Sequence, residues 1–273
     1  MLTSLARRAA LVSIASGLVV AAVAGGSAAS GATRHPAAHP NAKITTASLS
    51  AVSVAPHSTT AFALGLQSTN AGSTPYALRR SGSHWSKVTL KLPSPATSDQ
   101  LFEVAAGSPH SAWIVGDVFG GTSDTTLIEH STGGGFKPVK TSIGQGQFLS
   151  VSASSASNAW AVGDGLPTST PLIAHWNGHK WAAMKDTKQT GFNDSEVSTS
   201  SANNVWILGN DAKGVVVTFW NGHKLKVMQL TLPSGASLNR IATTSSKNTW
   251  VAGTISVGTT TLHPQPFTEH WNG

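Results

Sequence analysis

Three charged residues occur at one position of a segment that recurs along the chain, ten residues before a tryptophan: Glu103, Glu196 and Arg240. Ser150 occupies this position in another copy, and Ala51 matches it in the first copy after a shift of one residue. Two carboxylates about 5–10 Å apart are the catalytic pair of many glycoside hydrolases, so Glu103 and Glu196 are candidates for that chemistry. The same charged residues could instead bind a ligand or an ion, or line a water-filled channel as solvated charges.

A second group of acidic residues follows the tryptophan segments. Asp117, Asp164 and Asp211 stand one or two residues after the glycine that ends each segment. We expect them in loops at one mouth of the fold, where their oxygens could hold sugar hydroxyls or a calcium ion. Asp and Asn also fill turns for backbone reasons alone, and this alternative stays open.

The sequence lacks the residues that several other kinds of chemistry require. The chain has no cysteine, which excludes a disulfide scaffold, a thiolate metal site and a cysteine nucleophile. It has no Gly-x-Ser-x-Gly elbow and no phosphate-cradling glycine loop, and Gly133–Gly135 replaces a hairpin turn. The candidate metal ligands His130, His175 and His270 recur at one position of the repeat and are expected to lie far apart. We therefore predict no metal site and no cofactor.

These residues are positioned by five copies of one unit. The first half of a copy has the form Leu149-Ser-Val-Ser-Ala-Ser-Ser-Ala-Ser-Asn-Ala-Trp-Ala-Val-Gly163, and the second half contains His-Trp-Asn-Gly, as at residues 175–178. The aromatic residue of the first half recurs every 44 to 51 residues, at Phe62, Trp113, Trp160, Trp206 and Trp250.

Each copy predicts four short strands, which the third copy illustrates. Alternating residues 148–153 form the first strand, and residues 159–162 form the second after a Ser/Asn turn. Residues 172–176 form the third strand, and Asn177–Gly178 indicates a two-residue type I′ turn into the fourth. Four-stranded units of about 47 residues are typical of the blades of a β-propeller, which bury their faces by stacking around an axis.

The pattern Ser-x-x-Asn-x-Trp-x-Val-Gly, followed by His-Trp-Asn-Gly-x-x-Trp, resembles the repeat of secreted bacterial β-propellers of the actinobacterial type. It is more distantly similar to sialidase-type and photosystem-assembly-factor-type propeller repeats. The resemblance covers roughly residues 49–273 and implies an all-β propeller, but no activity, because propellers host many functions. The sialidase Ser-x-Asp-x-Gly-x-Thr-Trp box is absent from the sequence, so sialidase chemistry is not implied.

All nine tryptophans fall at repeat positions, so we interpret them as packing between blades rather than as a ligand platform. They lie on the second strand (Trp113, Trp160, Trp206, Trp250), the third (Trp176, Trp220, Trp271) and the fourth (Trp85, Trp181). The last copy stops at Asn272–Gly273, before its fourth strand. The chain is therefore either a five-bladed ring with an imperfect closure or part of a larger propeller. We favour five blades, with residues 43–47 as an out-of-register strand donor.

The N-terminus predicts export. Arg7 and Arg8 precede an apolar run of small residues from Ala9 to about Ala24, as in a secretory signal peptide. The run is shorter than the roughly 20 apolar residues of a membrane span, which favours cleavage over an uncleaved anchor. Twin-arginine export is an alternative, and cleavage contexts lie near Ala24 and near Ala32. The predicted organisation is a signal peptide at 1–32, a linker or N-terminal strand at 33–48, and the propeller at 49–273.

Composition narrows the partners. Cleavage lowers the formal net charge from +7 to +5, and the basic residues are scattered singly except for Arg79–Arg80. Nucleic-acid binding requires clusters, so we predict no such partner, and no membrane partner after cleavage. With 40% hydrophobic and only 11% charged residues, the chain is not disordered.

We therefore predict a secreted, extracellular or cell-surface-associated monomer of about five four-stranded blades. Its function is non-enzymatic binding of a glycan or a cell-surface protein. The alternatives are a propeller-type glycoside hydrolase and a purely structural repeat module. The candidate ligand-binding residues are Glu103, Glu196, Arg240, Asp117, Asp164 and Asp211.

Overall fold

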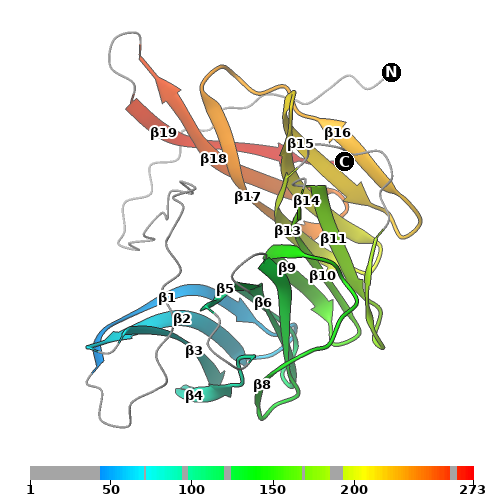
Figure 1. Cartoon of the computed structure of the whole chain (residues 1–273). Helices are drawn as coiled ribbons and strands as arrows, with labels where there is room; N and C mark the ends of the chain where they lie inside the picture. Colours follow the sequence, from blue (N-terminus) through cyan, green and yellow to red (C-terminus); the bar gives the residue numbers. More distant parts are fainter. Residues whose placement is uncertain are drawn as a thin grey trace.

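The computed structural model describes residues 44–70, 72–93, 98–119, 124–167, 170–184, 193–258 and 263–273. Within these ranges the chain forms nineteen strands (Figure 1). It forms no helix there, and hence none that could span a membrane. The predicted signal peptide lies outside the described residues, as does the predicted linker up to residue 43.

The strands form five successive antiparallel units, designated repeats 1 to 5. Repeat 1 contains β1 (Ile44–Val54), β2 (Ala61–Thr69), β3 (Gly72–Ser81) and β4 (His84–Leu90). Repeat 2 contains β5 (Ser98–Ser108), β6 (Ser111–Phe119), β7 (Asp124–Ser131) and β8 (Gly135–Pro138). Repeat 3 contains β9 (Gly146–Ser155), β10 (Asn158–Gly165), β11 (Thr170–Trp176) and β12 (Trp181–Ala183). Repeat 4 contains β13 (Asn193–Ser201), β14 (Asn204–Asp211), β15 (Gly214–Trp220) and β16 (Leu225–Gln229), and repeat 5 contains β17 (Ala236–Ser245), β18 (Asn248–Val257) and β19 (His263–Trp271).

This strand order confirms an all-β fold built from four-stranded sheets. Repeats 3 and 4 are separate four-stranded sheets, and a short parallel pairing of β4 with β8 joins repeats 1 and 2 into one eight-stranded sheet. Repeat 5 has three strands in the part of the chain that the structure describes. Residues 44–47, expected to complete that repeat, instead pair with β2 as the start of β1.

The predicted two-residue turn at Asn177–Gly178 is wrong. Trp176 pairs with Trp181, so the loop has four residues, and only Gly178 has a positive φ, of 92°. The Asn177 side chain accepts hydrogen bonds from the backbone amides of His179 and Lys180, at 3.1 and 3.0 Å. Asparagine is therefore used here to cap the loop with its side chain, not to adopt the left-handed conformation.

The glycine of the Trp-x-Val-Gly motif is explained by a bulge in the first strand. In repeat 3 the pairing of β9 with β10 shifts between Val162 and Gly163, and a Cβ on Gly163 would overlap the carbonyl oxygen of Gln147. The same overlap would arise at Gly65, Gly116 and Gly253. Only glycine allows the two backbones to approach this closely.

Successive repeats pack through their first strands, because β1, β5, β9, β13 and β17 are neighbours in that order. At three junctions a serine of one first strand accepts a hydrogen bond from a backbone amide of the next, at 2.9–3.1 Å. The pairs are Ser53 with Ala106, Ser152 with Thr199, and Ser198 with Thr243. Four apolar residues fill the junctions as predicted and are buried: Val104, Val151, Val197 and Ile241.

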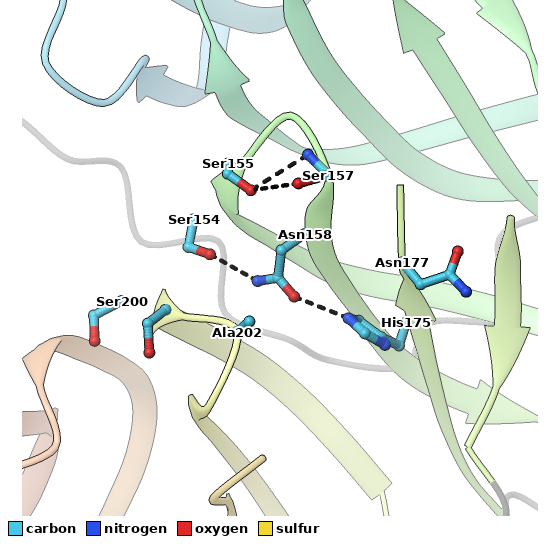
Figure 2. A pocket seen from close by; sticks show the side chains of 9 residues that line it. Ser154, Ser155, Ser157, Asn158, His175, Asn177, Ser200 and Ala202 are labelled. Atoms are coloured by element: carbon cyan, nitrogen blue, oxygen red, sulfur yellow. Dashed lines mark hydrogen bonds between the residues drawn. The ribbon is translucent and has the colours of Figure 1, made fainter. Parts of the chain in front are cut away.

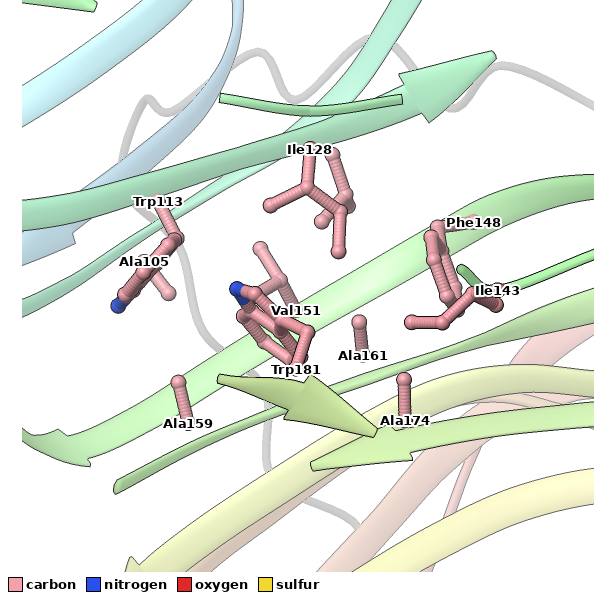
Figure 3. Packing of buried hydrophobic residues seen from close by; sticks show 11 residues of the cluster. Ala105, Trp113, Ile128, Ile143, Phe148, Val151, Ala159, Ala161, Ala174 and Trp181 are labelled. Atoms are coloured by element: carbon pink, nitrogen blue, oxygen red, sulfur yellow. The ribbon is translucent and has the colours of Figure 1, made fainter. Parts of the chain in front are cut away.

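Aromatic side chains fill the rest of each junction, which confirms the packing interpretation for most of the tryptophans but not for Trp85 and Trp250, which are 45% and 48% exposed. Trp113 of repeat 2 is fully buried, with its ring centroid 4.8 Å from that of Trp176 and 5.1 Å from that of Trp181, both in repeat 3. Figure 3 shows Trp113 and Trp181 in this core, together with Val151. Equivalent pairs are Trp160 with Trp220 and Trp206 with Trp271.

Candidate functional site

The structure brings the charged residues of the first strands together. Glu103, Ser150, Glu196 and Arg240, here named the inner polar cluster, occupy one register position just after the bulge of β5, β9, β13 and β17. Ala51 holds the same position in β1. Since these strands are neighbours, the regular repeat places the four side chains along one inner surface.

Two members of the cluster bind the next repeat. Glu103 Oε2 accepts a hydrogen bond from the backbone amide of Val151, at 2.9 Å. Ser150 Oγ accepts one from the amide of Val197, at 3.0 Å, in a buried position. The sequence pattern did not predict these contacts, which show that Glu103 and Ser150 hold adjacent repeats together.

The other two members form an ion pair. Arg240 Nη1 lies 3.0 Å from Glu196 Oε2 and also donates to the carbonyl of Asn239. The Glu196 side chain is only 13% exposed, whereas that of Arg240 is 73% exposed. The carboxyl group is therefore anchored in the surface, and the guanidinium group covers it from the solvent side.

The carboxyl groups influence one another. Burial raises the pKa of Glu103, while hydrogen bonds from Ser150 and Val151 and the charge of Arg240 oppose the shift. Burial and the charge of Glu103 together raise the pKa of Glu196 to about 8, again opposed by Arg240. Burial disfavours ionisation of both carboxyl groups, and the charge of Glu103 adds to this effect at Glu196, so the cluster retains protons at neutral pH more readily than free acids do.

The second predicted group of acids does not form a loop cluster. Asp117 lies within β6 and is 3% exposed, and Asp164 lies within β10, where burial raises its pKa against a hydrogen bond with Gln147. Placing these two in loops was wrong, because their strands extend beyond the motif glycine. Asp211 ends β14 and accepts a hydrogen bond from the amide of Lys213 at 2.8 Å, as the turn alternative requires.

The recurring histidines stack on the tryptophan of their own repeat. The ring centroids of Trp113 and His130 are 3.8 Å apart, and burial lowers the pKa of His130. His175 stacks in the same way on Trp160, and His270 on Trp250. Each ring also shares a hydrogen bond with a polar residue at the start of the second strand: Ser111, Asn158 or Asn248. No group of three or more metal-binding side chains occurs in the described ranges.

A recess of about 470 Å³ between repeats 3 and 4 was not foreseen (Figure 2). Most of the residues that line it are serines and asparagines at or beside the turns that join the first and second strands of both repeats, and His175 of β11 and Asn177 of the following loop complete the lining. Asn158 lies between Ser154 and His175 and bonds to both, at 2.7 and 2.9 Å. The clue in the sequence was the Ser-rich composition of these turns. The polar side chains at the centre of the recess already form hydrogen bonds with one another, so the recess is a weaker candidate site than the inner polar cluster.

Comparisons with known proteins identify no family. No family model matches the chain, and no curated protein matches its sequence. Among solved structures, the six-bladed, fucose-recognising lectin of the fungus Aleuria aurantia is 14% identical over 81% of this chain and 75% of its own, with a TM-score of 0.47. A chain of a nidogen/laminin complex is 10% identical over 74% and 71%, with a TM-score of 0.45, and YCF48 from Cyanidioschyzon merolae is 14% identical over 82% and 95%, with a TM-score of 0.37. At these values the similarities carry no argument about what this chain binds.

Proposed function

We propose that the protein is an exported, non-enzymatic β-propeller of about five blades that binds a carbohydrate at the inner polar cluster. The observation that carries the proposal is the Glu196–Arg240 pair, in which a shielded carboxyl group lies beside a largely exposed guanidinium group. A sugar presents adjacent hydroxyls that each donate and accept a hydrogen bond. The carboxyl oxygen can accept from one hydroxyl while the guanidinium donates to its neighbour.

The unused hydrogen-bond donors of Arg240 support this assignment. Within the described part of the chain its hydrogen bonds to protein groups all use Nη1. The guanidinium has five N–H donors in a fixed plane, so most of them remain directed at solvent. Asp117 and Asp164 do not belong to the proposed site, because the first is buried and both lie within strands of the sheets.

The test is a glycan array followed by calorimetry with the best glycan. Arg240→Met and Glu196→Ala, which remove the donor and the acceptor respectively, should each weaken binding at least tenfold, which corresponds to about 1.4 kcal/mol. Lys247→Met, which removes another exposed cation of repeat 5, is the matched control and should stay within twofold. Binding that survives both cluster variants overturns this site. A screen with no glycan bound leaves a protein partner or a purely structural module as the better function.

A glycoside hydrolase is the second candidate, because the raised pKa values of Glu103 and Glu196 match the need for one protonated carboxyl group. The bond from Val151 to Glu103 favours binding over catalysis, since it occupies an oxygen that a nucleophile would need. Release of nitrophenol from aryl glycosides, abolished by both Glu103→Gln and Glu196→Gln, would establish the enzyme. No release supports the binding module.

The proposed location rests on the N-terminal sequence alone. Expression with the native N-terminus in a bacterial host should deliver the protein outside the cytoplasm. N-terminal sequencing of the exported product should then begin near residue 25 or residue 33, according to which predicted cleavage site is used. An intact Met1 on exported protein would contradict cleavage.

A further inference from the structure

The first repeat exposes a face that is buried in every later repeat. Val52 aligns with Val104, Val151, Val197 and Ile241 in the pairing of the first two strands. Those four residues are 3–5% exposed, whereas Val52 is 66% exposed and Val54 is 61% exposed. The difference arises because each later repeat is covered by the one before it, and no repeat precedes repeat 1 in the part of the chain that the structure describes.

The last repeat exposes the complementary face. Trp250 of β18 is 48% exposed, although its counterparts Phe62, Trp113, Trp160 and Trp206 are at most 4% exposed. Each counterpart is covered by the following repeat, and repeat 5 has no successor in the described chain. Figure 1 shows repeats 1 and 5 at opposite ends of the arrangement.

The two most exposed tryptophans, Trp85 and Trp250, occupy the two positions that contact each other across the internal junctions. Trp85 is the second residue of β4 in repeat 1 and aligns with Phe136 and Trp181. Those two residues pack edge-on against the second-strand aromatic of the preceding repeat: Phe136 against Phe62 at 5.9 Å, and Trp181 against Trp113 at 5.1 Å. Trp85 is 45% exposed and lacks such a neighbour among the ring contacts of the described residues. A repeat 5 placed before repeat 1 would supply Trp250 for it.

We propose that repeat 5 of one chain docks on repeat 1 of a second copy, head to tail, through a junction like the four internal ones. The faces match because each is the same surface that the fold already pairs four times. Both faces are exposed in the described part of one and the same chain, so in this conformation a second copy can cover them. A head-to-tail contact closes into a ring of copies or continues as a filament. This assembly replaces the monomer expected from the sequence and does not depend on the proposed sugar site.

The internal junctions specify which residues would meet. Ser198 Oγ lies 2.9 Å from the amide of Thr243 in the next repeat. The residues at these two positions in the new junction are Ala242 of one copy and Val54 of the other. Their backbones should therefore approach within the range that a disulfide spans, about 4.4–6.8 Å between Cα atoms.

The absence of cysteine from the chain makes cross-linking a clean test. Chains carrying only Val54→Cys are mixed with differently tagged chains carrying only Ala242→Cys and then oxidised. We expect a cross-linked dimer carrying both tags. Replacing the first variant with Val227→Cys, on an exposed residue of the outer strand β16, should give none. An intrachain disulfide in a doubly substituted monomer, with no mixed dimer, would show that the chain closes on itself and overturn the proposal.

Association can be measured without cysteines. Light scattering after gel filtration should show a mass that rises with protein concentration. Val52→Asp and Trp250→Asp should each weaken association at least tenfold while preserving the circular dichroism of the fold, because both side chains are exposed in the single chain. Val227→Asp should associate like the parent protein. A parent protein that is monomeric at every concentration contradicts the inference.

Discussion

The carboxylate of Glu103 in β5 accepts a hydrogen bond from the backbone amide of Val151 in β9, 2.9 Å away across the boundary between repeats 2 and 3. Ser150 makes the equivalent bond to the next repeat. A first strand at the inner edge of a sheet has backbone amides that no further strand of its own sheet can pair. The side chains of the preceding repeat satisfy them, which couples neighbouring sheets that share no ladder.

Replacing Glu103 should therefore reduce stability in a way that depends on the acceptor. Glu103→Ala leaves the amide of buried Val151 without its acceptor, and we expect a loss of about 1–3 kcal/mol in the free energy of unfolding. Glu103→Gln keeps an oxygen at that position and should lose less than half as much. Urea denaturation at neutral pH measures both. Equal losses would mean that the hydrogen bond is not the source of the effect.

Stability should also depend on pH through Glu196. Its pKa rises from 4.5 to about 8 on folding, so the folded chain binds this proton more tightly than the unfolded chain. The contribution of this group to the free energy of unfolding is therefore fully present below pH 4.5 and declines as the pH rises towards 8. Residue 196 cannot titrate in Glu196→Gln, so the unfolding free energy of this variant should increase relative to that of the parent protein as the pH rises across this window. A difference that stays constant with pH, in parallel urea titrations, would rule this out.

The loss of stability on replacing a tryptophan should depend on whether another repeat packs over it. Trp113→Ala opens a cavity in the core between repeats 2 and 3, and we expect it to cost about 3–5 kcal/mol. Trp250→Ala removes a half-exposed side chain of the same type at the same repeat position, and should cost less than half of that. Both are measured by thermal and urea denaturation at high dilution, where association does not contribute. Similar losses for the two variants would contradict the junction argument.

The motif glycine should not tolerate even a methyl group. In Gly163→Ala the added Cβ meets the carbonyl oxygen of Gln147, a backbone atom that cannot move without distorting the bulge, so we expect a loss of about 2–3 kcal/mol. Gly134→Ala places its Cβ in open space and should remain within about 0.5 kcal/mol of the parent protein. If Gly163→Ala is equally neutral in urea denaturation, close backbone approach does not explain the motif.

The sequence determined the features that recur in every copy: the all-β class, the number of repeats, the packing role of most tryptophans, and the apolar positions that enter each junction. Periodic patterns reveal these features because alternation along a strand and the spacing of turns are local properties. The same patterns placed Glu103, Glu196 and Arg240 at one position of the repeat, and the strand register places them at equivalent positions of their first strands.

Only the tertiary structure decided what differs between copies. The partner of Glu103 is a backbone amide 48 residues away, and Asp117 is buried because β6 continues past its glycine. Val52 and Trp250 carry the same residue types as most of their buried counterparts, yet they are exposed because no repeat of the described chain covers them. Burial and pairing depend on which segments meet in space, and a repeated sequence is silent on what lies beyond its first and last copies.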